Sequence, residues 1–208
     1  MNERVLLQQG WGPCTPLLRL ALAHHREYCS ARGIRHVPVW SRPWHIRGEE
    51  LGRDKLILLD WFLHHFVSTD GMIVVLDADA LIVGGENLMD ALPADSEMAM
   101  VRSWNGYFNT GAWWLRNTER VRAFIARLAR SPEPPRGATY GDQQRLVNEL
   151  PGVQLRVAEL NARWNCYGAP ANTVREPVQI LAWHSPDMAP ALKLAAMRGA
   201  LWGANHAA

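Results

Sequence analysis

Two aspartates one residue apart follow a strongly apolar run and are the residues of this sequence best suited to chemistry. Asp77 and Asp79 come directly after the apolar residues 73–76. Ligands in open α/β sheets bind at the carboxyl ends of strands, and paired carboxylates there need a cation or hydrogen bonds to offset their charge. Mg²⁺ and Mn²⁺ accept carboxylate oxygen and bridge to phosphate. The pair therefore predicts a metal site, although a short Asp-x-Asp can also simply cap a turn.

Three later segments also place polar groups at the borders of apolar runs. Residues 108–117 read Phe-Asn-Thr-Gly-Ala-Trp-Trp-Leu-Arg-Asn, residues 141–148 begin Gly-Asp-Gln-Gln, and residues 182–184 read Ala-Trp-His. Amide and backbone groups such as those in 108–117 suit the binding of hydroxyl groups, but the same residues can form a plain turn before a strand. Asp142 can equally cap a helix, and a histidine after an apolar strand is often a packed core residue.

Taken in order, the four segments resemble the motifs of glycosyltransferases with the GT-A fold. The likeness is greatest to the retaining branches, namely the galactosyltransferase and mannosyltransferase groups and the bacterial lipopolysaccharide galactosyltransferases. It extends over most of the chain. The resemblance implies one GT-A domain over residues 1–208, with a mostly parallel sheet flanked by helices. It also implies a hexosyltransferase that uses a nucleotide diphosphate sugar, with UDP as the expected carrier.

The resemblance assigns residues to the metal and to the nucleotide. Asp77, Asp79 and His184 are expected to hold Mn²⁺ or Mg²⁺, which bridges the two phosphates of the donor; Mn²⁺ accepts both oxygen and imidazole ligands. Lys55, on the helix before the metal-binding strand, is expected at the phosphates, and the alternative is an exposed structural lysine. Trp11, just after the first strand, is expected to stack on the nucleotide base.

The resemblance also assigns residues to the sugar. Asn109, Thr110 and Gly111 are expected to line the donor sugar. Asp142 and Gln143 match the Asp-Gln pair of these enzymes, in which the aspartate holds sugar hydroxyls and the glutamine lies near the anomeric carbon. Together they are the predicted catalytic residues, and an amide at this place indicates transfer with retention.

The stretch after His184 departs from the related bacterial enzymes, which often carry His-x-x-Gly-x-x-Lys. This spacing is not kept between His184 and Lys193, so the resemblance leaves the role of Lys193 at the phosphates open. Two other functions remain open. One is a phosphatase of the haloacid dehalogenase type, in which Asp77 would be the nucleophile, although its Asp pair normally follows the first strand. The other is a nucleotide-sugar-binding module without turnover.

Acceptor recognition is expected from tryptophan-rich loops, because the chain has no obvious room for a separate acceptor domain. The candidates are residues 40–44, Trp104 and residues 164–167. Such loops suit both sugars and aromatic compounds, so the acceptor stays open.

The elements that must position these residues alternate between strand and helix, which indicates α/β architecture. Thr15 and Thr118 are expected to cap helices, and Gly33 to end the first helix. The expected strands are 5–8, 34–40, 72–76, 97–102, 111–115, 153–157 and 178–183, and the expected helices are one between Thr15 and Gly33, one that starts at Thr118, and 53–67, 142–150 and 188–201.

Composition bounds the class of protein. Of 208 residues, 48% are hydrophobic and 20% are charged, which is typical of a globular domain. The formal net charge of +2 is too small to indicate binding to nucleic acid. No apolar run reaches the roughly 18 residues of a membrane span, so a cytoplasmic location is expected. Cys14, Cys29 and Cys166 are expected to be buried thiols, because their number and spacing suit neither disulfides nor a zinc site.

Overall fold

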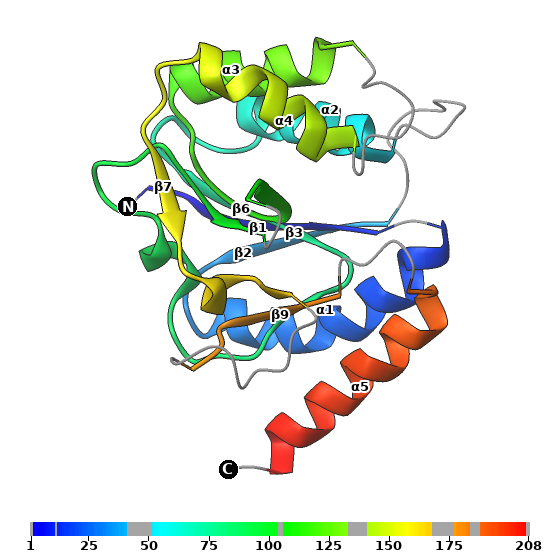
Figure 1. Ribbon diagram of the computed structural model, residues 1–208. Coiled ribbons are helices and arrows are strands. Elements are labelled where there is room, and N and C mark those ends of the chain that lie inside the picture. Colours follow the sequence, from blue (N-terminus) through cyan, green and yellow to red (C-terminus); the bar gives the residue numbers. More distant parts are fainter. Residues whose placement is uncertain are drawn as a thin grey trace.

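A six-stranded sheet forms the centre of the molecule, and helices cover both of its faces (Figure 1). The computed structural model describes residues 2–10, 12–40, 51–103, 106–132, 141–167, 177–183 and 188–206. The strand order is β2-β1-β3-β6-β5-β7. These strands are β1 (Arg4–Gln9), β2 (Arg35–Val39), β3 (Met72–Asp77), β5 (Met98–Arg102), β6 (Phe108–Arg116) and β7 (Val157–Leu160).

The sheet is mixed but mostly parallel. β1 pairs parallel with both β2 and β3, and β5 pairs parallel with β7, whereas β6 runs antiparallel to its neighbours β3 and β5. The register of β1 and β3 runs from Arg4 opposite Met72 to Gln9 opposite Asp77. The carboxyl ends of these two strands therefore meet at the same edge of the sheet, and the predicted α/β class is confirmed.

Helices pack on both faces of the sheet (Figure 1). α2 (Leu51–His65), α3 (Glu119–Arg130) and α4 (Gly141–Glu149) cover one face. α1 (Thr15–Ser30) covers the other face beside a small second sheet in the order β4-β9-β8, and α5 (Pro190–His206) packs on α1. The strands of the small sheet are β4 (Ala80–Ile82), β8 (Cys166–Tyr167) and β9 (Ile180–Ala182). Side chains alternate along β1 and β3, so Leu7 and Val75 pack with α2, and Leu6 and Val74 lie in the core on the α1 side.

Local sequence signals account for two helix starts. Thr118 caps α3 as predicted, because its Oγ1 accepts the Val121 backbone N–H at 3.2 Å. The predicted cap at Thr15 is wrong by one residue: the N-cap position is Cys14, and Thr15 is already helical. Pro16 favours this start, since a proline in the first turn gives up an N–H that has no partner in the helix.

Other predicted boundaries also shift. α1 ends before Gly33, whose φ of 62° makes the turn that leads into β2. The strand predicted at 153–157 begins only at Val157, where pairing with β5 starts opposite Met98. The strand predicted at 178–183 is shortened to β9, and neither β4 nor β8 was predicted.

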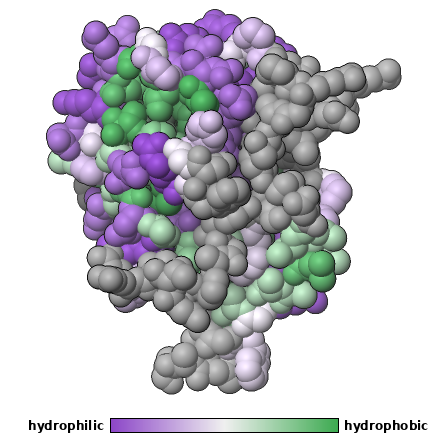
Figure 2. All heavy atoms as spheres, viewed as in Figure 1, coloured by the Kyte–Doolittle hydropathy of each residue, from purple (hydrophilic) through white to green (hydrophobic). Residues whose placement is uncertain are grey.

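Cys29 and Cys166 are buried free thiols as predicted, while the free thiol of Cys14 is half-buried. Among the described residues, no helix combines the length and the apolar character that a membrane crossing needs. Figure 2 shows hydrophobic residues in the lower part of the view, where α5 lies, and α5 exposes Leu192 and Trp202.

Candidate active site

Asp77 and Asp79 lie on the turn that takes the chain from the large sheet to the small one. Asp77 ends β3, and Asp79 directly precedes β4. Gly10, just after β1, packs tightly against this turn, because a Cβ at that position would lie 2.7 Å from the Cβ of Ala78. The turn thus places two carboxylates over the carboxyl ends of β1 and β3, as the sequence predicted.

The ammonium group of Lys55 joins three segments of the chain at this turn. Its Nζ lies 2.8 Å from Asp77 Oδ1 and 3.1 Å from Asp142 Oδ2, and it donates to the Thr110 carbonyl. Burial lowers the pKa of Lys55, but the carboxylates of Asp142 and Asp77 raise it by more, so its pKa lies above the ordinary value of lysine. The side chain is only 5% exposed, so the alternative of an exposed structural lysine is wrong.

A second lysine contacts the second carboxylate. Lys193 of α5 places its Nζ 2.6 Å from Asp79 Oδ2, and both side chains are mostly buried. Lys55 and Lys193 are the only lysines in the sequence, against twenty arginines. Both therefore pair with the Asp-x-Asp turn. The sequence pattern gave no reason to expect this contact of Lys193, because it joins residues that are far apart in the chain.

Asn109, Thr110 and Gly111 belong to the first half of β6, so the alternative of a plain turn before the strand is wrong. All three are buried. Asn109 Oδ1 accepts the Gly111 backbone N–H at 2.7 Å and Asn165 Nδ2 at 3.0 Å. Through the Thr110 carbonyl, which accepts from Lys55, this part of β6 forms a polar wall beside the Asp-x-Asp turn.

Asp142 and Gln143 lie in the first turn of α4 and are 8% and 7% exposed. The helix begins at Gly141, so Asp142 is a helical residue rather than the residue before the helix. A carboxylate at this place is stabilised by the positive end of the helix dipole. It is also paired with Lys55, which brings the Asp-Gln pair to the Asp-x-Asp turn.

Two predicted site residues, Trp11 and His184, lie outside the described residues. Within the described part of the chain, no three His, Cys, Asp or Glu side chains form a group that could hold a metal ion. The last described residue before His184 is Trp183, and its backbone N–H donates to the Asp79 carbonyl at 3.0 Å. The end of β9 is therefore tied directly to the Asp-x-Asp turn.

The loops expected to recognise the acceptor are described only in part. Trp104 and residues 41–44 lie outside the described residues. Trp40 is 37% exposed. Trp164, in contrast, is buried and packs edge-to-face on Trp114 with ring centroids 5.9 Å apart, which makes it part of the core rather than a binding platform.

Gln9 is a candidate ligand-binding residue that sequence reasoning missed. It pairs with Asp77 on the adjacent parallel strand, so the two side chains leave the same face of the sheet. It is 8% exposed, and its Oε1 is buried without a hydrogen-bond partner among the described residues. Such an atom costs free energy unless a ligand or water satisfies it. Only its place at a strand end, next to Gly10, could have indicated it.

Cys14, at the start of α1, lies close enough to Asp77 and Asp79 for their charges to change the pKa of its thiol. Burial and the carboxylate of Asp79 raise the pKa of its thiol, Lys193 lowers it, and Asp77 raises it further, so that the net pKa lies above the usual value. The thiol is therefore protonated at neutral pH and is a poor nucleophile.

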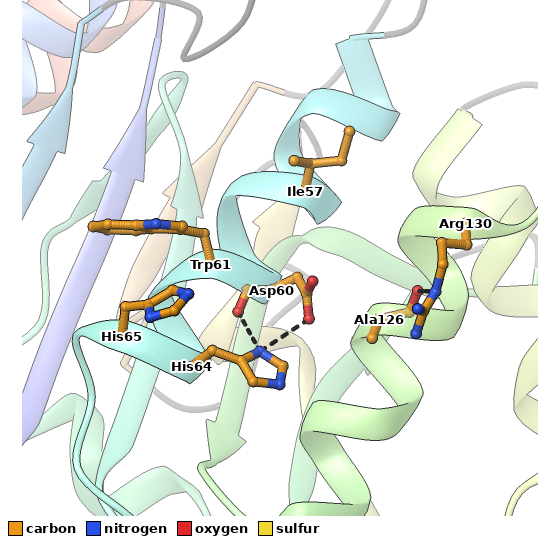
Figure 3. Close-up of a pocket in the computed structure, with 7 residues that line it drawn as sticks. All are labelled: Ile57, Asp60, Trp61, His64, His65, Ala126 and Arg130. Carbon is orange, nitrogen blue, oxygen red and sulfur yellow. Dashed lines mark hydrogen bonds and ion pairs between the residues drawn. The ribbon is translucent and has the colours of Figure 1, made fainter.

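A separate surface pocket of about 350 Å³ lies between α2 and α3 (Figure 3). His64 turns back to Asp60, with its Nδ1 3.2 Å from Asp60 Oδ1, and Trp61 is 43% exposed. With 100° per residue along a helix, these residues lie on the side of α2 opposite Lys55. The pocket therefore does not connect with the Asp-x-Asp turn. It is lined by Ile57, Asp60, Trp61, His64, His65, Ala126 and Arg130.

Known structures share this fold, although no protein-family model and no curated protein sequence matches the chain. A glycosyltransferase involved in the glycosylation of the major capsid of PBCV-1 superposes with a TM-score of 0.75 at 17% identity, covering 95% of this chain and 99% of its own. The galactosyltransferase LgtC, in complex with donor and acceptor sugar analogues, gives 0.54 at 12% identity, covering 96% and 95%.

A third match is the apo form of the glycosyltransferase GlyE from Streptococcus pneumoniae TIGR4, with a TM-score of 0.55 at 16% identity, covering 95% of this chain and 63% of that one. LgtC also matches as an active-site variant in which a glutamine is replaced by glutamate. Identities this low establish the fold alone. The chain has the GT-A glycosyltransferase fold over nearly its whole length, which confirms the predicted fold.

Proposed function

We propose that this chain is a metal-dependent glycosyltransferase that moves a hexose from a nucleotide diphosphate donor, a UDP-sugar, to an acceptor with retention at the anomeric carbon. The observation that carries the proposal is the contact of Lys55 with both Asp77 and Asp142. It joins the Asp-x-Asp and Asp-Gln segments at the carboxyl edge of the sheet, in a fold shared with glycosyltransferases.

The residues at the turn fit a hard divalent cation. Asp77 and Asp79 offer carboxylate oxygens, which Mn²⁺ and Mg²⁺ prefer, and His184 is the proposed third ligand. The hydrogen bond from Trp183, its neighbour in the chain, to the Asp79 carbonyl supports this assignment. When bound, the ion would offset the negative charge that develops on the departing diphosphate.

Both lysines of the chain are suited to the same diphosphate. Each ammonium is paired with one carboxylate of the turn, Lys55 with Asp77 and Lys193 with Asp79. A donor phosphate that arrives at the turn therefore meets two positive charges that burial keeps in place. In this arrangement Lys193 has a role at the phosphates even though the usual motif spacing is absent.

The sugar is proposed to lie between β6 and the start of α4. Asn109 and Asp142 supply polar groups for its hydroxyls, and Gln143 places an amide near the anomeric carbon. As the bond between the anomeric carbon and the diphosphate breaks, the acceptor oxygen bonds to that carbon on the same face, and the leaving phosphate takes the proton of the acceptor hydroxyl. The Gln143 amide stabilises the positive charge that builds up on the sugar. The active-site glutamine of LgtC supports this role by analogy.

A thermal-shift screen of UDP-, GDP- and TDP-sugars with Mn²⁺ tests donor binding, because a ligand that binds only the native state raises its stability. Hydrolysis of the stabilising donor then separates an enzyme from a binding module without turnover. Proton NMR of the first product formed from an α-linked donor tests retention: an α-linked product supports it, and a β-linked product contradicts it. Hydrolysis of phosphate monoesters but of no nucleotide sugar would favour the phosphatase alternative.

A further inference from the structure

A series of mostly buried hydrogen bonds links α1 to the backbone of the Asp-x-Asp turn. Gln8 Nε2 donates to the Asp77 carbonyl at 3.1 Å and to the Ala80 carbonyl at 3.2 Å. Gln8 Oε1 lies 2.9 Å from His25 Nδ1, and His25 Nε2 lies 2.9 Å from the Ile82 backbone nitrogen. Backbone groups on both sides of Asp79 are therefore held by two side chains from β1 and α1.

The donor or acceptor character of each group fixes the direction of every hydrogen bond in this series. The carbonyls of Asp77 and Ala80 can only accept, so the Gln8 amide must turn both of its N–H bonds toward them. Gln8 Oε1 then needs a donor, which requires the proton of His25 to be on Nδ1. That leaves His25 Nε2 free to accept the N–H of Ile82. Neutral His25 with its proton on Nδ1 therefore gives every group in this series a hydrogen-bond partner.

The surroundings keep His25 in that neutral form. Gln8 and His25 are both fully buried. Burial, together with the neighbouring His36 and His24, holds the pKa of His25 well below its ordinary value. His24, the neighbouring residue of α1, contacts the same residue, because its Nε2 lies 2.6 Å from the Ile82 carbonyl. Both backbone polar groups of Ile82 are thus bound by α1.

We propose that Gln8 and His25 are positioning residues that set the distance between the carboxylates of Asp77 and Asp79. Asp77 belongs to the large sheet and Asp79 leads into the small one, so nothing in the pairing of either sheet alone fixes the two relative to each other. The Gln8 amide does so, because it binds the backbone on both sides of Asp79. That these carboxylates serve a metal rests on the function proposed above; the positioning itself does not.

The hydrogen-bond chain can be tested in the unmodified protein. In ¹⁵N-labelled protein, the ring signals of His25 should show a protonated Nδ1 and an unprotonated Nε2 that do not change between pH 5.5 and 8. A His25 ring that carries its proton on Nε2 would overturn the proposal, because Gln8 Oε1 would then lack its donor. A ring that titrates in this range would overturn it as well, because a doubly protonated ring cannot accept the Ile82 N–H.

The consequence for the turn is tested with Gln8→Met, which keeps the length of the side chain and removes its hydrogen bonds. The matched control is Gln154→Met at an exposed position. Amide hydrogen exchange over residues 78–82 should accelerate about ten-fold in Gln8→Met, since two hydrogen bonds to the turn are lost, while β5 exchanges as before. The control should change neither.

Binding of Mn²⁺, followed by electron paramagnetic resonance of the free ion, measures the effect on the carboxylates. We expect Gln8→Met to weaken Mn²⁺ binding about ten-fold, as for other groups that orient metal ligands. In the enzyme assay the half-saturating Mn²⁺ concentration should rise to the same extent, with turnover at saturating Mn²⁺ changed less than two-fold. Unchanged Mn²⁺ binding in a folded Gln8→Met variant would refute the positioning role and leave the proposed enzyme intact.

If the unmodified protein binds no Mn²⁺, the proposed metal-dependent function is wrong. Hydrogen exchange then tests whether Gln8 and His25 position the turn. Faster exchange confined to residues 78–82 supports it, and exchange at the rate of the control refutes it. If Gln8→Met does not fold, the ring tautomer of His25 in the unmodified protein decides instead.

Discussion

Replacing Lys55 with methionine should destabilise the protein by an amount that depends on pH. The substitution keeps an unbranched apolar stem, removes the ammonium group, and leaves the carboxylates of Asp77 and Asp142 without their shared cation. Removing one partner of a buried ion pair costs about 3–5 kcal/mol. The Asp142 side chain is 11% exposed, but that of Asp77 is 34% exposed and can be solvated, so we expect the lower end, about 3 kcal/mol.

The sign of the pH dependence follows from the charges. The pKa of Lys55 is raised, so its contribution to stability is complete below the ordinary lysine pKa of about 10.4. It is therefore constant between pH 5 and 8 in the unmodified protein. In Lys55→Met, protonation of one carboxylate at acid pH relieves the unpaired charge. The deficit in stability should thus be larger at pH 8 than at pH 5.

Urea unfolding at pH 5 and pH 8 measures both quantities, and thermal unfolding at pH 8 should show a midpoint lowered by about 6–12 °C. Arg19→Met is the matched control, because it removes a positive charge from an exposed position of α1 and should change stability by less than about 0.5 kcal/mol. A deficit in Lys55→Met no larger than that of the control, or one that grows toward pH 5, would show that the buried ion pair does not exist as described.

Four further substitutions test the site and its surroundings. Gly10→Ala should destabilise the protein by about 1–3 kcal/mol in urea unfolding, because the new Cβ would lie 2.7 Å from a neighbouring side chain. Asp79→Asn should speed alkylation of Cys14 at pH 8, since the Asp79 carboxylate raises the pKa of that thiol, and should abolish glycosyl transfer. Gln143→Ala should lower turnover about a hundred-fold with donor affinity little changed, as for a group that acts in the transition state. His184→Ala should weaken Mn²⁺ and donor binding together in calorimetry.

The buried strand and the helix cap were predictable because their signals are local. The apolar run 73–76 predicts β3 from burial on both faces, and Thr118 predicts the start of α3 from a hydrogen bond within one turn. The strand at 153–157 shows where a local signal fails. Val153, Leu155 and Val157 do pack on the core, so the alternation indicated burial correctly. Strand pairing, however, also needs β5, which is opposite only from Val157 onward.

The candidate site was predictable as a set of segments but not as a set of contacts. Residue types and a strand end were enough to select Asp77 and Asp79, and the family resemblance selected Asp142. The burial of Lys55 and the reach of Lys193 depend on how α2 and α5 pack, and no local pattern reports packing between distant elements. β4 was missed for the same reason, since β9, its pairing partner among the described residues, lies about a hundred residues further along the chain.

The choice of lysine at the site follows from the acceptors it meets. An ammonium has three N–H donors, and Lys55 meets three acceptors, on Asp77, Asp142 and Thr110. A guanidinium there would bring five donors in one plane and bury some of them without partners. Arginine appears instead where a planar fork fits, as where Arg163 places its two terminal nitrogens 2.6 and 3.0 Å from the two oxygens of Glu86. In the proposed reaction the compact ammonium has a second advantage, because it can turn from a carboxylate toward a phosphate with only a rotation of its side chain.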